Sequence, residues 1–232
     1  EFNLKISAAK KGYKPIFYPD KILQNDLVPK QYPIGSLPLT PTYDCDEGYG
    51  LIKYTTDRLG LRNKDENWND ISKKSNLFLI GDSFAHGSCV NENHSIAGIL
   101  RIYKKKNIIN LASPSNSPHE YKAIIKLVVD PIIKNSNSRN TVIIVFYAND
   151  YLPYKENREK LLNDTKPLLI YNSKKSELFL SEKYIKDLQN YIVNNYPQSS
   201  DEIVKKIKLI NRENLMKIKN SKIFYTFSLL PL

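Results

Sequence analysis

The sequence predicts an α/β fold in which helices cover both faces of a parallel sheet. From residue 76 onward, short apolar runs alternate with segments in which apolar residues recur at helical spacing. Strands that alternate with helices imply right-handed crossovers, and therefore parallel pairing. The chain has 232 residues, of which 41% are hydrophobic and 25% charged, so it can bury a core of the size that one such domain needs.

Residues 1–70 are predicted to form an irregular extension that packs on the α/β domain of residues 71–232. The extension is too rich in tyrosine to be simply disordered, and no sustained apolar period runs through it. Prolines break any long helix in this section. They are Pro15, Pro19, Pro29, Pro33, Pro38 and Pro41.

The α/β domain opens with Leu77–Ile80, a continuous apolar run that ends at a glycine and indicates a strand buried on both faces. Helical spacing over 94–105 predicts a helix with one apolar face. That face comprises Ile96, Ile99, Leu100 and Tyr103. The further predicted elements, in order, are a strand at 108–111, a helix at 119–134, a strand at 142–147, helices at 180–195 and 200–219, and a strand at 223–229.

Polar residues stand where the predicted strands end, the edge at which parallel sheets gather their active groups. Gly81, Asp82 and Ser83 follow the first strand. A serine in a tight strand-to-helix turn has an exposed hydroxyl and a backbone N–H that can stabilise an oxyanion, as acyl transfer requires. Gly, Asp and Ser are also common in ordinary turns, so these three residues alone do not identify an active site.

Two more loops reach the same edge of the sheet. Residues 113–118 follow the second strand, and Asn149 and Asp150 follow the third. The loop can direct a backbone N–H, and Asn149 a side-chain amide, toward the oxyanion position of Ser83. An Asn-Asp pair is also a common turn or helix cap.

Together, the three strand ends resemble the sequence blocks of the SGNH/GDSL hydrolases. GDSFAHG is similar to the first block, ASPSNSP lies where the second block has its oxyanion glycine, and YANDY is similar to the third. The resemblance implies a flavodoxin-like doubly wound sheet in three α/β/α layers. It makes Ser83 the nucleophile, with Ser83, Ser115 and Asn149 as oxyanion donors. The residues expected beside this site are Asp82, His86, Asn116, His119 and Asp150.

An upstream run resembles a bacterial, envelope-associated subgroup of these proteins, and the resemblance covers roughly residues 40–230. The matching positions are Tyr54, Asp57, Arg58, Gly60, Leu61 and Asn63. The subgroup implies action on acylated polysaccharides in the cell envelope or periplasm, with the cytoplasm as the alternative. It also carries cysteines at the places of Cys45 and Cys89, which implies a disulfide; two buried thiols are the alternative.

A serine nucleophile needs a base, which the family supplies from a C-terminal Asp-x-x-His. The three histidines of this chain do not form that motif. We expect His86 to be a surface or substrate-contacting group and His94 a polar helix start, whereas His119 can reach the mouth of the site. Because the chain stops where a fourth strand would deliver its loop, we expect the pair in residues that follow Leu232.

Three functions remain open at this point. The first is an ester hydrolase or O-acyl transferase that acts on an acylated carbohydrate or small ester, and the second is a non-catalytic carbohydrate-binding or scaffold protein. The third, nucleic-acid binding, is suggested by the net charge of +11. It is disfavoured because the lysines are spread along the chain. No cofactor, metal site or stable membrane insertion is expected, and the sequence does not indicate the oligomeric state.

Overall fold

The computed structural model describes residues 2–17, 34–148, 169–172, 177–195, 199–210 and 213. Its central sheet has three parallel strands, with β4 (Asn76–Ile80) between β5 (Asn107–Asn110) and β6 (Thr141–Ile144). Phe78 pairs with Ile109 on one side and with Val142 on the other. The chain is therefore a mixed α/β protein with parallel strands, as predicted.

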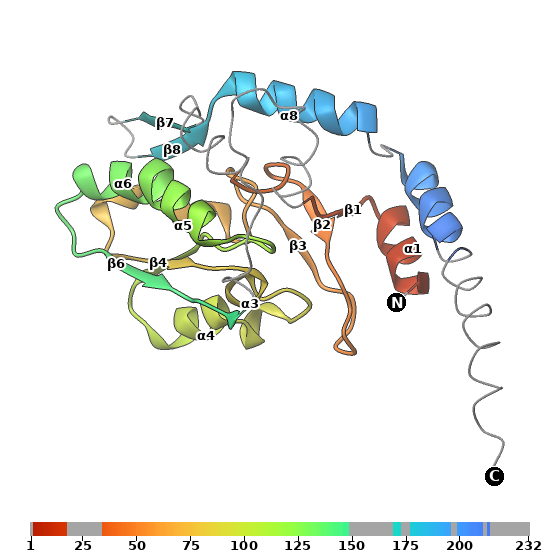
Figure 1. Cartoon of the computed structure of the whole chain (residues 1–232), viewed down its shortest axis with the longest axis horizontal. Coiled ribbons are helices and arrows are strands. Elements are labelled where there is room, and N and C mark those ends of the chain that lie inside the picture. Colours follow the sequence, from red (N-terminus) through yellow and green to blue (C-terminus); the bar gives the residue numbers. More distant parts are fainter. Residues whose placement is uncertain are drawn as a thin grey trace, which may run out of the picture.

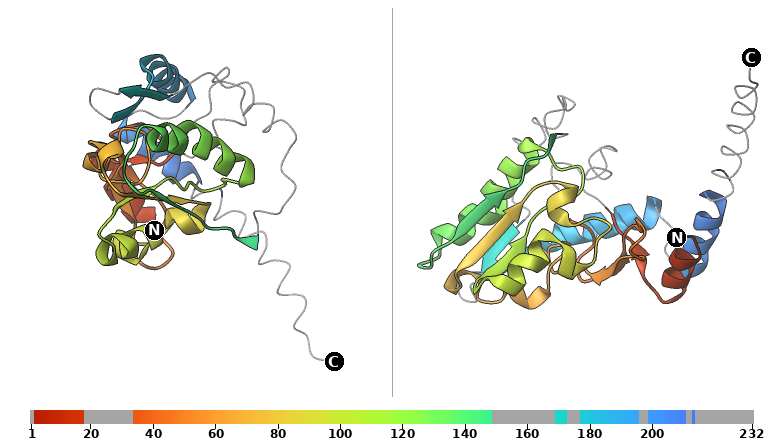
Figure 2. Two further views of the ribbon diagram at one scale, coloured as in Figure 1. Left: turned by 90° about the vertical axis from the view of Figure 1, so that its left-hand side faces the viewer. Right: turned by 90° about the horizontal axis from the view of Figure 1, so that it is seen from below.

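Both faces of β4 are covered, as the continuous apolar run predicted. All five residues of the strand are buried. Phe78 and Ile80 pack in a cluster with the helical stretch from α5 (Pro118–Ile124) to α6 (Asp130–Lys134). Leu77 and Leu79 pack with Ala85 and with α4 (Ile96–Tyr103). Figures 1 and 2 show the two sets of helices on opposite sides of the sheet.

The helical stretch predicted at 119–134 is continuous but changes its winding in the middle. It consists of α5 (Pro118–Ile124), a π-helical turn (Ile125–Val129) and α6 (Asp130–Lys134). Pro131 lies just beyond the π-helical turn. Because proline has no N–H to donate and its ring crowds the carbonyl four residues earlier, wider winding before it accommodates the ring without ending the helix.

Helix α4 (Ile96–Tyr103) forms as predicted, but the face that it buries is not the predicted one. Ser95 caps it by accepting a 3.0 Å hydrogen bond from the N–H of Gly98. Ala97 and Gly98 are buried, while the predicted apolar face is largely exposed. The large exposed residues of the helix are Ile96, Ile99, Ile102 and Tyr103. A Cβ on Gly98 would lie 1.7 Å from the carbonyl oxygen of Glu92, so the close approach at this face selects small residues.

The N-terminal section contains more regular structure than the expected irregular extension. It has a helix, α1 (Phe2–Lys10), and a small sheet of β1 (Lys14–Pro15), β2 (Pro41–Tyr43) and β3 (Lys53–Thr55). β1 is parallel to β2, and β3 is antiparallel to it. Prolines are tolerated in this sheet because Pro15 lies in its edge strand and Pro41 is the first residue of β2.

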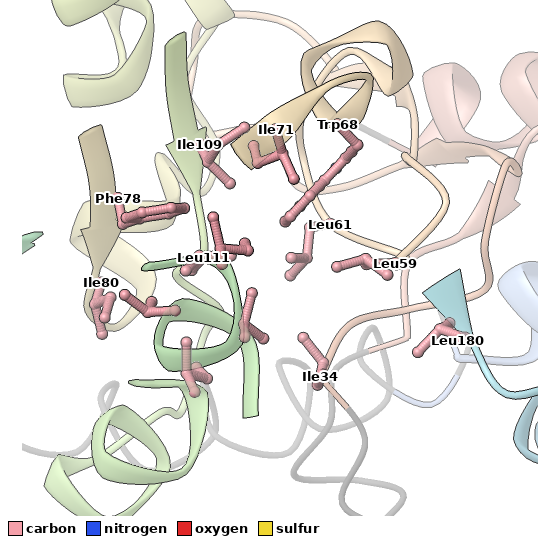
Figure 3. Packing of buried hydrophobic residues seen from close by; sticks show 14 of the residues in the cluster. Ile34, Leu59, Leu61, Trp68, Ile71, Phe78, Ile80, Ile109, Leu111 and Leu180 are labelled. Carbon is pink, nitrogen blue, oxygen red and sulfur yellow. The ribbon is translucent and has the colours of Figure 1, made fainter. Parts of the chain in front are cut away.

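The same section contributes large side chains to the core. Leu59, Leu61 and Trp68 are buried against residues of the central sheet, together with Ile34 (Figure 3). The segment therefore packs over the sheet on the side of α5 and α6. Two 3₁₀ turns, Asp65–Trp68 and Ile71–Lys73, lead from it into β4; a third, Glu92–His94, precedes α4.

A hairpin that the sequence analysis did not predict follows in the C-terminal part. It joins β7 (Leu169–Asn172) to β8 (Glu177–Leu180) in antiparallel pairing, and Leu180 enters the main core. The predicted helix at 180–195 is α8 (Glu182–Asn195), and a further helix spans 200–210. Ile207 of that helix packs against the cluster of Ala8, Tyr43 and Leu51, and Figure 1 shows the helix beside α1. The strand predicted at 223–229 lies outside the described residues. No described helix is both long and apolar enough to cross a membrane.

Candidate active site

Ser83 is the first residue of α3 (Ser83–His86), just beyond the carboxyl end of β4. Asp82 caps this single helical turn, and its Oδ1 accepts a 2.9 Å hydrogen bond from the N–H of Phe84. Gly87 ends the turn with a φ of 77°, a left-handed conformation that favours glycine. Both ends of the turn that presents Ser83 are thus fixed by local chemistry.

Gly81 allows this turn to lie close to the sheet. A Cβ at this position would lie 2.6 Å from the Cβ of Ala85 and 3.0 Å from the carbonyl oxygen of Val145. Any side chain here would push α3 away from β4 or from the end of β6. The glycine before Asp82 and Ser83 is therefore a packing requirement as well as a sequence signature.

The reactive atoms of Ser83 are not engaged by the described part of the chain. Its side chain is partly exposed. Neither its hydroxyl nor its N–H is hydrogen-bonded to a described residue, whereas its carbonyl accepts from the N–H groups of Gly87 and Ser88. Ser83 therefore has a hydroxyl and a backbone N–H without a hydrogen bond to a described residue, while its carbonyl oxygen is hydrogen-bonded to the residues that follow α3.

The loop after β5 is bonded to the nucleophile turn, because the N–H of Ser113 donates to the carbonyl of Gly81 at 3.3 Å. Ser115 is exposed and has a φ of 67°. It thus adopts the left-handed backbone that glycine prefers, at the position where the resemblance places the oxyanion glycine. Asn116 is buried, and Ser117 with Glu120 forms a capping box that starts α5.

His86 is buried, so the expectation of a surface or substrate-contacting histidine was wrong. Its Nε2 lies 3.4 Å from the hydroxyl of Tyr54 and its Nδ1 3.2 Å from that of Ser88. Burial, together with the smaller effect of the positive charge of Arg62, lowers the pKa of His86 to about 3, so the ring is neutral near pH 7.

The other two histidines, His94 and His119, are exposed. His119 stands at the start of α5, directly after the second loop. None of the three histidines is hydrogen-bonded to Ser83 in the described structure. The described residues therefore contain no assembled serine–histidine pair.

The segment after α3 is fastened to the N-terminal section by a disulfide and by an arginine. Cys45 and Cys89 form a disulfide, with their Cα atoms 4.8 Å apart. The buried Arg62 donates to the carbonyl oxygens of Gly87 at 2.5 Å and Val90 at 2.8 Å. Sequence reasoning gave Arg62 no role; its signal was a charged residue directly after the otherwise apolar Leu59–Leu61 stretch of the upstream motif.

The upstream motif is organised around the fully buried carboxylate of Asp57. Four N–H groups donate to it, from the backbones of Leu59 and Leu61 and the side chains of Asn63 and Trp68, at 2.7–2.9 Å. Burial raises the pKa of Asp57 to about 6, and these donors act in the opposite direction. The Oδ1 of Asn63 also accepts from the backbone of Asn110 at 2.7 Å, which ties the motif to the end of β5.

Aromatic rings lie beside the nucleophile turn. Phe84, the residue after Ser83, stacks on Tyr147 with ring centroids 4.0 Å apart, and each side chain is about half exposed. Phe146 meets Tyr121 edge to face at 5.6 Å. The end of β6 thus reaches the same edge of the sheet as α3.

Asn149 and Asp150, predicted after this strand, lie outside the described residues. Within the described ranges, no three His, Cys, Asp or Glu side chains are grouped as metal ligands would be. Comparison of the chain with protein-family models, curated proteins and solved structures gives no match.

Proposed function

We propose that the chain is an SGNH/GDSL-like serine ester hydrolase or O-acyl transferase, built on a flavodoxin-like sheet. One observation carries the proposal: Ser83 stands at the carboxyl end of the central parallel strand, with both its hydroxyl and its N–H unbonded to described residues. Active groups of parallel α/β sheets gather at this edge. The left-handed backbone of Ser115 supports the second oxyanion donor.

In the proposed reaction, the Ser83 hydroxyl oxygen attacks the ester carbonyl carbon while a base takes its proton. The carbonyl oxygen becomes an oxyanion, which accepts from the N–H groups of Ser83 and Ser115 and from the Asn149 amide. When the carbonyl re-forms, the bond to the leaving alcohol breaks and the alcohol receives the proton. Water or a second alcohol then takes the acyl group from Ser83.

The proposed substrate is an acylated carbohydrate or a small ester. The proposed location is the bacterial envelope or periplasm, with the cytoplasm as the alternative. The Cys45–Cys89 disulfide supports the first location, because such bonds persist in oxidising compartments.

A second candidate function is a non-catalytic carbohydrate-binding or scaffold protein. It is favoured by one observation, that none of the three histidines is bonded to Ser83 in the described structure. A serine without a base keeps its proton and remains a weak nucleophile. The two candidates therefore differ in whether Ser83 reacts covalently.

Fluorophosphonate labelling with peptide mapping distinguishes the two. An active site gives an adduct on Ser83 that is absent from Ser83→Ala and retained in Ser7→Ala, a control at an exposed serine of α1. Hydrolysis of p-nitrophenyl acetate should fall by roughly 10³-fold in Ser83→Ala. His119→Ala shows whether this histidine is the base. The protein is used with any residues that follow Leu232, where the Asp-x-x-His is expected. Labelling of that protein that does not depend on Ser83, or no labelling of it, rejects the enzyme and leaves the binding protein.

A further inference from the structure

We propose that Asn116 and Asp82 form a subsite for a hydroxyl group of the substrate, beside Ser83. The Asn116 amide would donate a hydrogen bond to the hydroxyl oxygen, and Oδ2 of Asp82 would accept one from the hydroxyl O–H. The inference rests on the proposed function, because it completes the same site. It narrows the substrate to an ester whose acid or alcohol part carries a free hydroxyl, as a partly acylated carbohydrate does.

The first observation is a pair of buried polar atoms that make no hydrogen bond in the described structure. They are Nδ2 of Asn116, a residue that is 4% exposed, and Oδ2 of Asp82, a residue that is 1% exposed. Leaving such an atom unpaired costs about 1–3 kcal/mol, and more for a charged group. One atom is a donor and the other an acceptor, and a hydroxyl group satisfies both kinds.

The second observation is that the backbone brings the two residues to the same place. The N–H of Ser113 donates to the carbonyl of Gly81 at 3.3 Å, and the N–H of Asn116 donates to the carbonyl of Ser113 at 3.1 Å. Asp82 follows Gly81 directly. Asp82 is thus the sequence neighbour of Gly81, and Asn116 is hydrogen-bonded to Ser113. Both residues therefore adjoin the Ser113–Gly81 hydrogen bond that joins the two loops.

The surrounding structure keeps Asn116 from relaxing to another partner. Ser115 before it is held at a φ of 67°, and Ser117 after it is locked to Glu120 by the capping box. The other oxygen of Asp82 is already committed to the N–H of Phe84. Unpaired groups fixed in this way are typical of binding sites, where the ligand supplies the missing partner.

A buried asparagine close by shows that this region can satisfy such an amide. Asn110, at the end of β5, donates to the carbonyl oxygens of Ala85 and His86 at 3.3 and 3.4 Å, and accepts from the N–H of Ala112 at 3.1 Å. Asn110 therefore has a structural role that Asn116 lacks. The two residues make a matched pair for mutation.

The test is a ¹⁵N NMR titration of the Ser83→Ala protein, which requires no turnover. The probe is ethylene glycol, and 1,2-dimethoxyethane, whose two hydroxyls are methylated, is the control. We expect a saturable shift of the Asn116 side-chain amide signal with ethylene glycol only. Asp82→Asn should weaken the binding at least roughly 5-fold, since the amide nitrogen that replaces Oδ2 cannot accept a hydrogen bond.

Stability measurements separate a ligand-binding Asn116 from a structural one. Asn116→Leu is expected to keep the melting temperature within about 2 °C of the parent or to raise it, because it removes an unpaired amide. Asn110→Leu should lower it by roughly 5 °C or more, because it leaves three groups unpaired. The subsite is overturned if the Asn116 signal does not move, if dimethoxyethane moves it equally, or if Asn116→Leu destabilises as much as Asn110→Leu. None of these outcomes depends on the reactivity of Ser83. The labelling experiment therefore tests the proposed esterase activity separately.

Discussion

Individual buried polar residues decide how the Ser83 turn is held in place. Asp57 gathers four N–H donors and thereby closes the loop of the upstream motif. Arg62 holds the carbonyl oxygens that follow α3. Asp57 therefore organises the motif itself, and Arg62 connects the motif to the backbone that follows the nucleophile turn. Neither side chain is hydrogen-bonded to the Ser83 hydroxyl in the described structure.

His86 makes stability depend on pH. Burial keeps its pKa near 3, while in the unfolded chain a histidine titrates near 6.5. Below about pH 6.5 the imidazole is protonated in the unfolded chain but stays neutral in the folded protein. This residue therefore lowers the stability of the fold as the pH falls from about 6.5 to about 3. We expect His86→Gln to lose less stability than the wild type between pH 7 and pH 4.5.

Urea unfolding at a series of pH values measures this difference. Asp57, whose raised pKa reduces stability as the pH rises from about 4 to about 6, is present in both proteins, so its effect cancels in the comparison. His94→Gln, at an exposed histidine, is the control and should follow the wild-type curve. Parallel curves for His86→Gln and the wild type would contradict the buried, neutral state of His86.

For individual residues, the sequence predicted where Ser83 stands, but it did not predict the burial of His86 or the backbone conformation of Ser115. The position of Ser83 after an apolar run predicted its place at a strand end, because strand and turn signals are local. The burial of His86 was not predictable, because its neighbours Tyr54 and Arg62 come from the N-terminal section. The left-handed φ of Ser115 was likewise hidden, because serine rarely adopts it.

Among the secondary-structure elements, α4 shows that a strong apolar stripe need not mark the buried face. The stripe lies largely on the exposed side, whereas Ala97 packs with residues of the central sheet and Gly98 is buried against Glu92. The helical period alone indicates that a helix forms. It does not indicate which of two apolar faces is buried, because that depends on how closely the helix approaches Glu92 and the sheet.

A pair of substitutions tests this orientation. Ile102→Gln should change the free energy of unfolding by less than about 0.5 kcal/mol, because the side chain is 63% exposed. Ala97→Leu should reduce it by about 1–3 kcal/mol, since extra carbons do not fit at a fully buried position. Urea unfolding measures both, and the reverse order of effects would mean that the helix is rotated.

The other elements differ in whether a local sequence pattern is enough to predict them. The three parallel strands were predictable, because continuous apolar runs are typical of strands in parallel sheets. Both faces are covered at β4, whereas Val142 and Ile144 of β6 are each 38% exposed. The π-helical turn and the hairpin of β7 and β8 were missed. Residues 173–176, between β7 and β8, contain no glycine, and the π-helical turn reflects local winding around Pro131, which a spacing pattern does not resolve.

In the molecule as a whole, the disulfide ties two layers of structure into one unit. Cys45 follows β2 of the small N-terminal sheet, and Cys89 follows the nucleophile turn of the central sheet. The 44-residue separation makes the closed loop long, and the loop contains both β3 and β4. The Ser83 turn therefore depends on the N-terminal section for its support.

Removing the disulfide should cost about 4 kcal/mol by the chain-entropy relation for a loop of this length. We expect the Cys45→Ser, Cys89→Ser double variant to fold with a free energy of unfolding lower by about 2–4 kcal/mol. Dithiothreitol should lower the stability of the wild type toward that of the variant and leave the variant unchanged. Equal stability of the two proteins without reductant would contradict the bond.

The bond also determines what happens when the backbone is broken. The exposed bend at residues 47–50 lies between the two cysteines, so a cut there opens the ring without releasing either piece. The two resulting polypeptides remain one covalent molecule until a reductant is added. In an oxidising setting, the N-terminal fragment would stay covalently linked to the serine turn after nicking; in a reducing one, only strand pairing and core packing would hold it there.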